Sequence, residues 1–460
     1  MKLPPSLSPS LSLPPRLLRW FYRIGPISQI SLIGLIALVS SSAFARAADA
    51  AADASASAAA NAPSSEPAAA PAPTPAYHIY AGNTHSHTSI TWSHGAQWMD
   101  PPGKPPVKGV SRNDDNSLSI APKNKVLKPD WQKVQGTPAV HFALAKENGY
   151  DFYATTDHSQ EETLHPTSPD NPAWLDEKRA AAAATDANFA AIAGFEFSEN
   201  RKDGDGNGHI NVFNTATYLN AMERGIDLRY LYKWLPAAPA NGDGPVVASF
   251  NHPNPPNYND WAYRDPAVTE MITMLEVINS NKYQPRYYES YIRALDKGWK
   301  VSPVSGMDNH GTGGISRMKA RTFVLASEKT KTAILDAMKH RRTYAALNST
   351  IQCRYTVNGA IMGSTLDAPA EFHFDISIND PDDKNPKNKI TKIDIVTDGG
   401  KILQTHEPSP AAFTVNWTPI IANTTSKYFF VRVWSANGGD TPDSTPDTPV
   451  AWLAPVWTGR

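Results

Sequence analysis

The chain has 460 residues, which exceeds what one compact domain usually needs, so we expect a large domain, a small domain and some non-globular sequence. Lys and Arg number 43 and Asp and Glu 44, and no Lys/Arg block follows the first 26 residues, which argues against a nucleic acid as the main partner and favours a small substrate. The single cysteine, Cys353, excludes an intramolecular disulfide.

The N-terminal residues have the pattern of a secretory signal. Residues 1–26 contain four basic residues and no acidic one. An apolar run covers residues 27–39, and small residues follow up to Ala45 and Ala47. The apolar run is shorter than the ~20 residues of a membrane span, although an uncleaved anchor is an alternative. We therefore predict a signal peptide at residues 1–47, a periplasmic or secreted protein, and no stable membrane insertion after cleavage. Residues 48–76, rich in Ala and Pro, are expected to form a disordered linker.

Residues 77–350 alternate short β-rich apolar runs with helical patterns, which is typical of βα units around a parallel sheet or barrel. Thr137 and Pro138 open one predicted helix, and Asn148 and Gly149 end it. Two later helices are expected near residues 287–295 and 334–338. The predicted strands of this part are residues 151–156, 192–197, 209–214, 246–250, 274–278, 301–305 and 322–325.

Residues 351–460 have a different pattern, because strand-like runs alternate with loops rich in Pro, Asp, Asn and Gly, and helical periodicity is lost. Strands are expected at residues 371–378, 390–397 and 428–434. We interpret this region as a small antiparallel β-sandwich that follows the α/β domain.

Histidines and acidic residues recur at the ends of the predicted strands. Barrel enzymes form their sites at the carboxyl ends of their strands, so these side chains are expected to meet. In the segment from His85 to His87, extended geometry sends both imidazoles to the same side. The set, which predicts a cluster of divalent metals, comprises His85, His87, His158, Glu196, His209, His252, Asp308 and His310.

This ordered series resembles the PHP (polymerase and histidinol phosphatase) superfamily of metal-dependent phosphoesterases. The similarity spans most of residues 80–312. It implies a distorted (β/α)7 PHP-type barrel and typically three metals. The helix exit at residues 341–345, together with residues 428–434 and 451–457, resembles the C-terminal sandwich of a secreted branch of this superfamily.

Carried over position by position, the resemblance implies a ligand set for each ion. The first ion would be held by His85, His87, Glu196 and Asp308. Glu196 would bridge to a second ion, which is completed by His209 and His252. A third ion would be held by His158 and His310, with His94 as a candidate for the family's additional ligand.

The resemblance also implies a chemistry, in which a hydroxide that bridges two cations attacks a phosphate ester. Metals lower the pKa of water from about 15.7 towards about 7 and neutralise charge on phosphoryl oxygens. The third ion, near His310 or His158, would stabilise the leaving-group oxygen. Arg264 and Arg317 follow His252 and His310 and are candidates for binding phosphate, with an ordinary solvated arginine as the alternative.

Histidine and carboxylate ligands without thiolate suit Mn, Zn or Fe, in two or three sites. The predicted substrate is a small phosphorylated organic molecule, as a monoester or a diester, and the oligomeric state is left open. One alternative is an amidohydrolase-like C–N or C–O hydrolase, although that superfamily commonly bridges its metals with a modified lysine where this chain has Glu196. The other alternative is a non-enzymatic, metal-stabilised surface binding protein.

Overall fold

The computed structural model describes residues 76–92, 95–103, 125–199, 208–279, 287–367, 369–422, 425–441 and 443–459. The predicted signal peptide and nearly all of the predicted linker lie outside these residues, as does His94. Of the helices in the described ranges, none is long and apolar enough to cross a membrane.

The first part of the chain builds one long curved sheet. Its hydrogen-bonded order is β11-β10-β1-β4-β5-β6-β7-β8-β9. The bounds are β1 (His78–Asn83), β4 (Phe152–His158), β5 (Ala190–Glu199), β6 (Gly208–Phe213), β7 (Val247–Asn251), β8 (Ile272–Asn279), β9 (Ser302–Gly306), β10 (Arg321–Ala326) and β11 (Thr343–Ala346), with a separate pair β2 (Trp98–Met99) and β3 (Val126–Leu127). The predicted strands of this part are therefore confirmed.

The sheet is mixed, so the prediction of a parallel sheet is wrong in part. Four pairs are parallel, namely β1–β4, β4–β5, β7–β8 and β8–β9. However, β6 runs antiparallel to both β5 and β7, and β10 runs antiparallel to β1 and β11. The segment between β5 and β6 is too short for the crossover connection that a parallel pair requires, which explains the reversal.

The ends of this sheet approach each other through side chains. Ser305 on β9 donates its backbone N–H to Thr322 Oγ1 on β10 at 2.8 Å, and the Thr322 hydroxyl returns a bond to Ser305 O at 2.9 Å. The Thr343 hydroxyl on β11 also donates to Pro303 O at 3.0 Å. The result is a mixed α/β fold with a curled sheet, in which strands β4, β5 and β8 are buried along their whole length.

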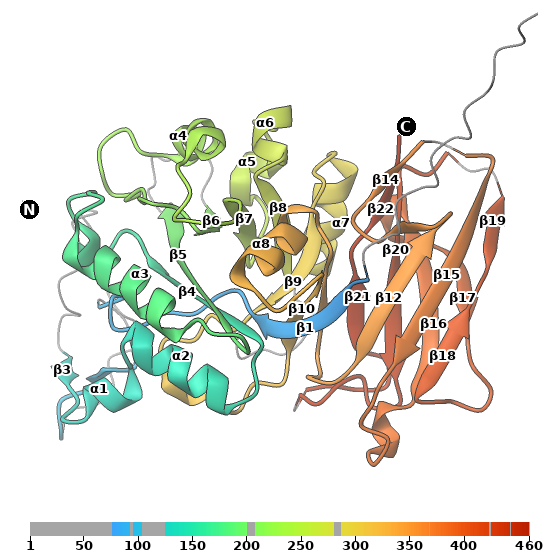
Figure 1. The fold of residues 1–460 in the computed structure, drawn as a ribbon, viewed down its shortest axis with the longest axis horizontal. Helices are drawn as coiled ribbons and strands as arrows, with labels where there is room; N and C mark the ends of the chain where they lie inside the picture. The colour runs from blue at the N-terminus through green and yellow to red at the C-terminus, as the bar shows by residue number, and fades with distance from the viewer. Residues whose placement is uncertain are drawn as a thin grey trace, which may run out of the picture. The chain divides into compact units, whose positions relative to one another are not determined.

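Helices α2 and α3 pack against one face of the sheet, and Figure 1 shows them side by side next to β4. Helix α8 packs against the opposite face, on alternate side chains of the same strands. Thr137 caps α2 with Pro138 in its first turn, and Asn148 and Gly149 end it, as predicted. The helices are α1 (Trp131–Val134), α2 (Pro138–Glu147), α3 (Pro172–Ala184), α4 (Leu228–Trp234), α5 (Asn257–Trp261), α6 (Pro266–Thr269), α7 (Tyr288–Asp296) and α8 (Lys331–Lys339). Short 3-10 turns are η1 (Glu162–Leu164), η2 (Leu235–Ala237), η3 (Thr312–Gly314), η4 (Pro386–Asn388) and η5 (Asp398–Gly400).

Residues 351–459 are organised in strands that pair almost entirely antiparallel. One sheet has the order β13-β12-β15-β18, with β19 also on β15, while β17, β16, β20, β21, β22 and β14 continue the long sheet. Phe372 and Phe374 of the first sheet contact Phe429 of the second, with ring centroids 4.7 and 5.7 Å apart. The bounds are β12 (Gln352–Val357), β13 (Ala360–Ile361), β14 (Thr365–Leu366), β15 (Glu371–Asn379), β16 (Ile390–Thr397), β17 (Lys401–His406), β18 (Thr414–Trp417), β19 (Ile420–Ala422), β20 (Tyr428–Ser435), β21 (Ala451–Leu453) and β22 (Val456–Thr458).

The boundary predicted at residue 350 falls between β11 and β12, but the hydrogen-bonded sheet crosses it. Strand β21 pairs antiparallel with β11, with Ala451 opposite Ala346. Helix α7 packs on β20, where Tyr291 lies 5.6 Å from Phe430 between ring centroids. The Tyr428 hydroxyl donates to Asp296 at 2.8 Å. The C-terminal strands therefore cover an edge of the α/β part.

Candidate metal centre

The segments that carry the first and last predicted ligands are joined through their backbones. The chain leaves β1 in extended form, and the backbone N–H of His87 donates to Asn309 O at 3.0 Å. In return, the Asp308 N–H donates to His85 O at 2.9 Å. This short parallel bridge brings two histidines and an aspartate from opposite ends of the α/β part to the same place.

Four side chains converge at the centre of this cluster. His85 Nε2 lies 3.1 Å from His87 Nε2, 3.3 Å from Glu196 Oε1 and 3.5 Å from Asp308 Oδ1. His87 Nε2 lies 3.0 Å from Asp308 Oδ1 and 3.7 Å from Glu196 Oε2. Donor atoms arranged tetrahedrally around an ion at about 2.0–2.1 Å are roughly 3.3 Å apart, so these separations match those of a first coordination sphere.

Glu196 also meets the histidines of three other strand ends. Its Oε1 atom lies 3.1 Å from His209 Nδ1 and 3.3 Å from His252 Nε2, and its Oε2 atom lies 2.7 Å from His158 Nδ1. The antiparallel strand β6 explains how His209, at the start of a strand, reaches the same place as residues at the ends of others. A fully buried carboxylate with histidine nitrogens near both oxygens, and with no hydrogen-bond donor on Oε2 among the described residues, is suited to bridge two cations.

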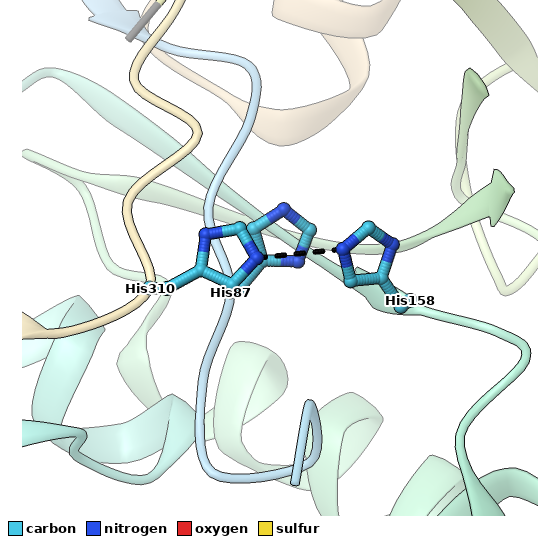
Figure 2. A group of neighbouring side chains, drawn as sticks. All are labelled: His87, His158 and His310. Atoms are coloured by element: carbon cyan, nitrogen blue, oxygen red, sulfur yellow. Dashed lines mark hydrogen bonds between the residues drawn. The ribbon is translucent and has the colours of Figure 1, made fainter. Parts of the chain in front are cut away.

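A third group consists of histidines alone, and Figure 2 shows the three rings facing one another. His310 Nε2 lies 3.4 Å from His158 Nε2, and the His87 ring stacks on both, at 4.3 Å from His158 and 4.1 Å from His310 between centroids. His87 therefore lies between the first and third groups, which the resemblance did not imply. His94, the remaining candidate for the third ion, lies outside the described residues.

The electrostatics of the cluster suit cations. Burial disfavours charge on Glu196, but His209, His158 and His85 outweigh it and hold the pKa of that carboxyl well below its usual range. Asp308 is affected in the same way: burial opposes its charge, yet His85 and other imidazoles hold the pKa of Asp308 well below its usual range. Burial, and then the neighbouring His310, lowers the pKa of His87 to about 3, which leaves this imidazole neutral and able to donate a lone pair.

The residues present fit divalent metal ions. Among the described residues, the ion-pair partners of Glu196 and Asp308 are all histidines, without Lys or Arg. Four overlapping sets of three possible ligands have donor atoms within 4.8 Å of one another. Nitrogen and oxygen donors without sulfur suit Mn, Zn or Fe. The sets are His87, His158 and His310; His85, His87 and Glu196; His85, His252 and Asp308; and His158, Glu196 and His209.

Asp157, which directly precedes His158, holds the turn that follows His87. Its carboxylate accepts the backbone N–H of Thr88 at 2.7 Å and that of Thr91 at 2.9 Å, and both threonine hydroxyls donate to it at 2.7 Å. The Thr91 hydroxyl also lies 3.4 Å from His87 Nδ1. Asp157 is therefore a support of the ligand segment and not a ligand.

Tyr258 was not singled out from the sequence, yet it connects two strands that carry ligands. Its hydroxyl lies 2.7 Å from His209 O and 2.8 Å from Asn251 O. Its ring lies against Gly208, where a Cβ atom would meet the ring at 2.4 Å. Both hydroxyl contacts involve backbone atoms of the paired strands β6 and β7, so no side-chain pattern in the sequence signals them.

The two arginine candidates for phosphate binding lie in different places. Arg317 lines a cavity of about 330 Å³ together with His310 and residues 311–314, and its Nε donates to Gly313 O at 2.6 Å. Arg264 is exposed, and its guanidinium lies about 3.3 Å from where a Cβ of Gly298 would stand. Gly298 precedes β9 whereas the ligands follow it, so Arg264 lies at the other end of that strand and is not assigned to the site.

No protein-family model matches the chain, and no curated protein matches it. Three solved structures are similar to it at low identity. A two-domain protein from Bacteroides vulgatus, containing a predicted PHP-like metal-dependent phosphoesterase, is 15% identical and has a TM-score of 0.40, over 83% of this chain and 96% of that one. A proposed metal-dependent phosphoesterase from Bifidobacterium adolescentis is 14% identical, with a TM-score of 0.23 over 39% of this chain and 85% of that one.

The third structure is an amidohydrolase from Chromobacterium violaceum with bound sulfate and no metal. It is 13% identical, with a TM-score of 0.22 over 39% of this chain and 84% of that one. The chemistry assigned to the site therefore rests on its own donor atoms.

Proposed function

We propose that the chain is an exported, metal-dependent hydrolase that cleaves phosphate esters of small organic molecules. The observation that carries this proposal is the convergence of His85, His87, Glu196 and Asp308, with donor separations of 3.0 to 3.7 Å that match one coordination sphere. A second and a third group share Glu196 and His87 with it. Adjacent cation sites that share a carboxylate are the arrangement used for phosphoryl transfer to water.

Bound divalent ions would lower the pKa of water and neutralise the charge that grows on phosphoryl oxygens. The chain's own residues supply the rest. Glu196 and Asp308 remain anionic at neutral pH, as the direction of their pKa shifts requires. His310, partly exposed, faces the cavity of about 330 Å³, which lies in the size range of small-ligand sites. Arg317, which lines the same cavity, is the candidate for binding a phosphate oxygen.

The finer parts of the proposal follow from the sequence. The PHP-like barrel with a C-terminal sandwich is the architecture we propose for the curled α/β sheet and the facing sheets after it. The signal-like residues 1–47 support a periplasmic or secreted location. Mn, Zn or Fe are the ions proposed, and the choice between monoester and diester is left to experiment.

The experiment measures metal content by elemental analysis, together with hydrolysis of p-nitrophenyl phosphate and bis-p-nitrophenyl phosphate before and after chelation. We expect about two or three ions per chain and release of nitrophenol that chelation abolishes. Glu196→Ala and Asp308→Ala are expected to lower turnover by more than about 100-fold, because even outer neighbours of metal ligands change activity by about 10- to 100-fold.

The matched control is Glu371→Ala, which removes an exposed carboxylate on β15 of the C-terminal part and is expected to leave turnover unchanged. Unchanged turnover in Glu196→Ala would contradict the proposal. Hydrolysis of amides or lactones without hydrolysis of phosphates would favour an amidohydrolase-like enzyme. Bound metal without turnover of any ester would favour a metal-stabilised binding protein.

A further inference from the structure

One buried carboxylate contacts the metal centre without lying among its donor atoms. Glu276, on β8, places Oε1 at 2.8 Å from His85 Nδ1. Its Oε2 atom accepts the backbone N–H of His252 at 2.8 Å and the side-chain N–H of Asn279 at 2.8 Å. Its side chain is 1% exposed. Both oxygens are therefore used, and two of the three partners belong to residues that carry donor atoms.

The contact with His85 determines which ring nitrogen carries the hydrogen. An ionised carboxylate only accepts hydrogen bonds, so Nδ1 of His85 must be protonated to face it. In the neutral ring, Nε2 then keeps its lone pair. That atom faces His87 Nε2 at 3.1 Å and Glu196 Oε1 at 3.3 Å, at the centre of the first donor group.

The contact with His252 acts on the backbone. His252 has a φ of +30°, in a region that residues other than glycine rarely adopt and that costs about 1–3 kcal/mol. The bond from its N–H to Glu276 helps to offset this cost. In this conformation the ring places Nε2 at 3.3 Å from Glu196 Oε1 and 3.9 Å from Asp308 Oδ2.

The neighbouring strand leaves room for this carboxylate. Gly306 ends β9, and a Cβ atom there would lie 1.8 Å from Glu276 Oε1 and 2.9 Å from His85 Cβ. Its φ is not in the positive region, so space and not backbone conformation requires glycine at this position. Strands β8 and β9 thus build the position of Glu276 together.

We propose that Glu276 is a positioning residue of the metal centre. It fixes His85 in the tautomer that presents Nε2 to an ion, and it fixes the backbone of His252 so that its ring joins a neighbouring group. This inference rests on the metal binding in the proposed function and adds a residue that binds no ion. It predicts that substitution of Glu276 lowers the affinity for metal ions while the fold is retained.

The test uses Glu276→Gln in the full-length protein. The amide has the same shape, but its NH₂ group cannot accept a hydrogen bond, so at least one of the three donors loses its partner. We expect Zn²⁺ affinity, measured by competition with a chromogenic chelator, to fall about 10- to 100-fold while the far-UV circular dichroism spectrum is retained. Glu276→Asp keeps the charge on a shorter side chain, and its Zn²⁺ affinity is expected to lie between those of the wild type and Glu276→Gln.

The matched control is Glu177→Gln, the same chemical change at another buried carboxyl. Glu177, on α3, contacts the Thr155 hydroxyl at 2.8 Å and none of the donor atoms, so Zn²⁺ affinity should not change. If Glu276→Gln binds Zn²⁺ with wild-type affinity, the inference about Glu276 is overturned but the proposed function is not. Wild-type protein that binds no Zn²⁺ would overturn both the inference and the proposed function. If Glu276→Gln does not fold, wild-type affinity in Glu276→Asp overturns the inference.

Discussion

At the scale of single residues, buried histidines with the same chemistry have different roles in the same region of the fold. His141 is fully buried beside the ligand segment, yet its Nε2 donates to Gln135 O at 2.7 Å and its Nδ1 lies 3.1 Å from Ser86 Oγ. Both ring nitrogens are thus used by the protein. His141 is structural, and neutrality of its ring matters for stability instead of metal binding.

This role predicts a dependence of stability on pH. Burial lowers the pKa of His141 from 6.5 to about 4, so between these values the unfolded chain takes up a proton that the folded chain excludes. The contribution of the neutral His141 ring to the free energy of unfolding is fully present above pH 6.5 and is lost as the pH falls towards 4. At pH 5 the loss should be about 2 kcal/mol relative to pH 7.

The measurement is urea unfolding of wild type and His141→Gln at pH 7 and pH 5. The variant is less stable at both pH values but should lose about 2 kcal/mol less between them, since glutamine does not titrate. An equal loss of unfolding free energy in both proteins would show that His141 does not cause this dependence on pH.

The sequence predicted the donor residues better than their grouping or their supports. Histidines and acids at strand ends were visible because each strand has its own apolar pattern. The position of His87 between the first donor group and the group of three histidines was not visible in the sequence. It depends on the bridge between residues 85–87 and 308–309, which are far apart in the chain. Arg264 illustrates a related limit, because its distance in sequence from His252 does not determine which end of a strand its loop covers.

At the scale of elements, the turn after His87 depends on one acidic side chain of another strand. Asp157, at the end of β4, accepts four hydrogen bonds from Thr88 and Thr91. Burial raises the pKa of Asp157, while the bonds from these threonines oppose that shift. The turn is thus built around an acceptor whose burial is costly and whose hydrogen bonds compensate for it.

Asp157→Ala removes the acceptor of all four bonds and leaves buried donors unsatisfied. The free energy of unfolding should fall by on the order of 3 kcal/mol. Asp157→Asn, the matched variant, retains an oxygen at the position of Oδ1, which serves three of the four bonds, and should lose less. Urea unfolding followed by circular dichroism compares the two, and equal losses would contradict this account.

Element positions were largely predictable and strand directions were not. Thr137, Pro138 and Gly149 mark the ends of α2 through local chemistry, which the sequence contains. Apolar periodicity is the same for either direction of β6, so its direction follows only from the connection to β5, which is too short for a crossover. The pairing of β21 with β11 was also not predictable, because the sequence of each strand is only a short apolar run that carries no information about its partner.

At the scale of the whole molecule, the C-terminal strands are part of the sheet that carries the candidate metal centre. Strand β21 covers the edge of β11, and Phe430 packs against Tyr288, Tyr291 and Tyr428. A free sheet edge with buried apolar faces favours aggregation. The α/β part is therefore expected to depend on the strands that follow it.

Truncation after residue 350 tests this dependence and should give a chain that aggregates or unfolds without a cooperative transition. In the full-length protein, Phe430→Ala should lower the free energy of unfolding by about 3–5 kcal/mol while keeping a single calorimetric transition, because the side chain is fully buried. A soluble truncated chain that unfolds cooperatively would show that the two parts are independent.

The pairing of β11 with β21 has a consequence for the order of synthesis. The strand that completes this edge, β21, follows β11 and all the candidate ligands in the chain, so it is synthesised after them. Until then a nascent chain carries all eight of the described ligands on a sheet whose edge is still open. Maturation of the candidate metal centre is therefore expected only after β21 has been synthesised, and chaperones that protect open strand edges should matter more to this protein than rapid local folding.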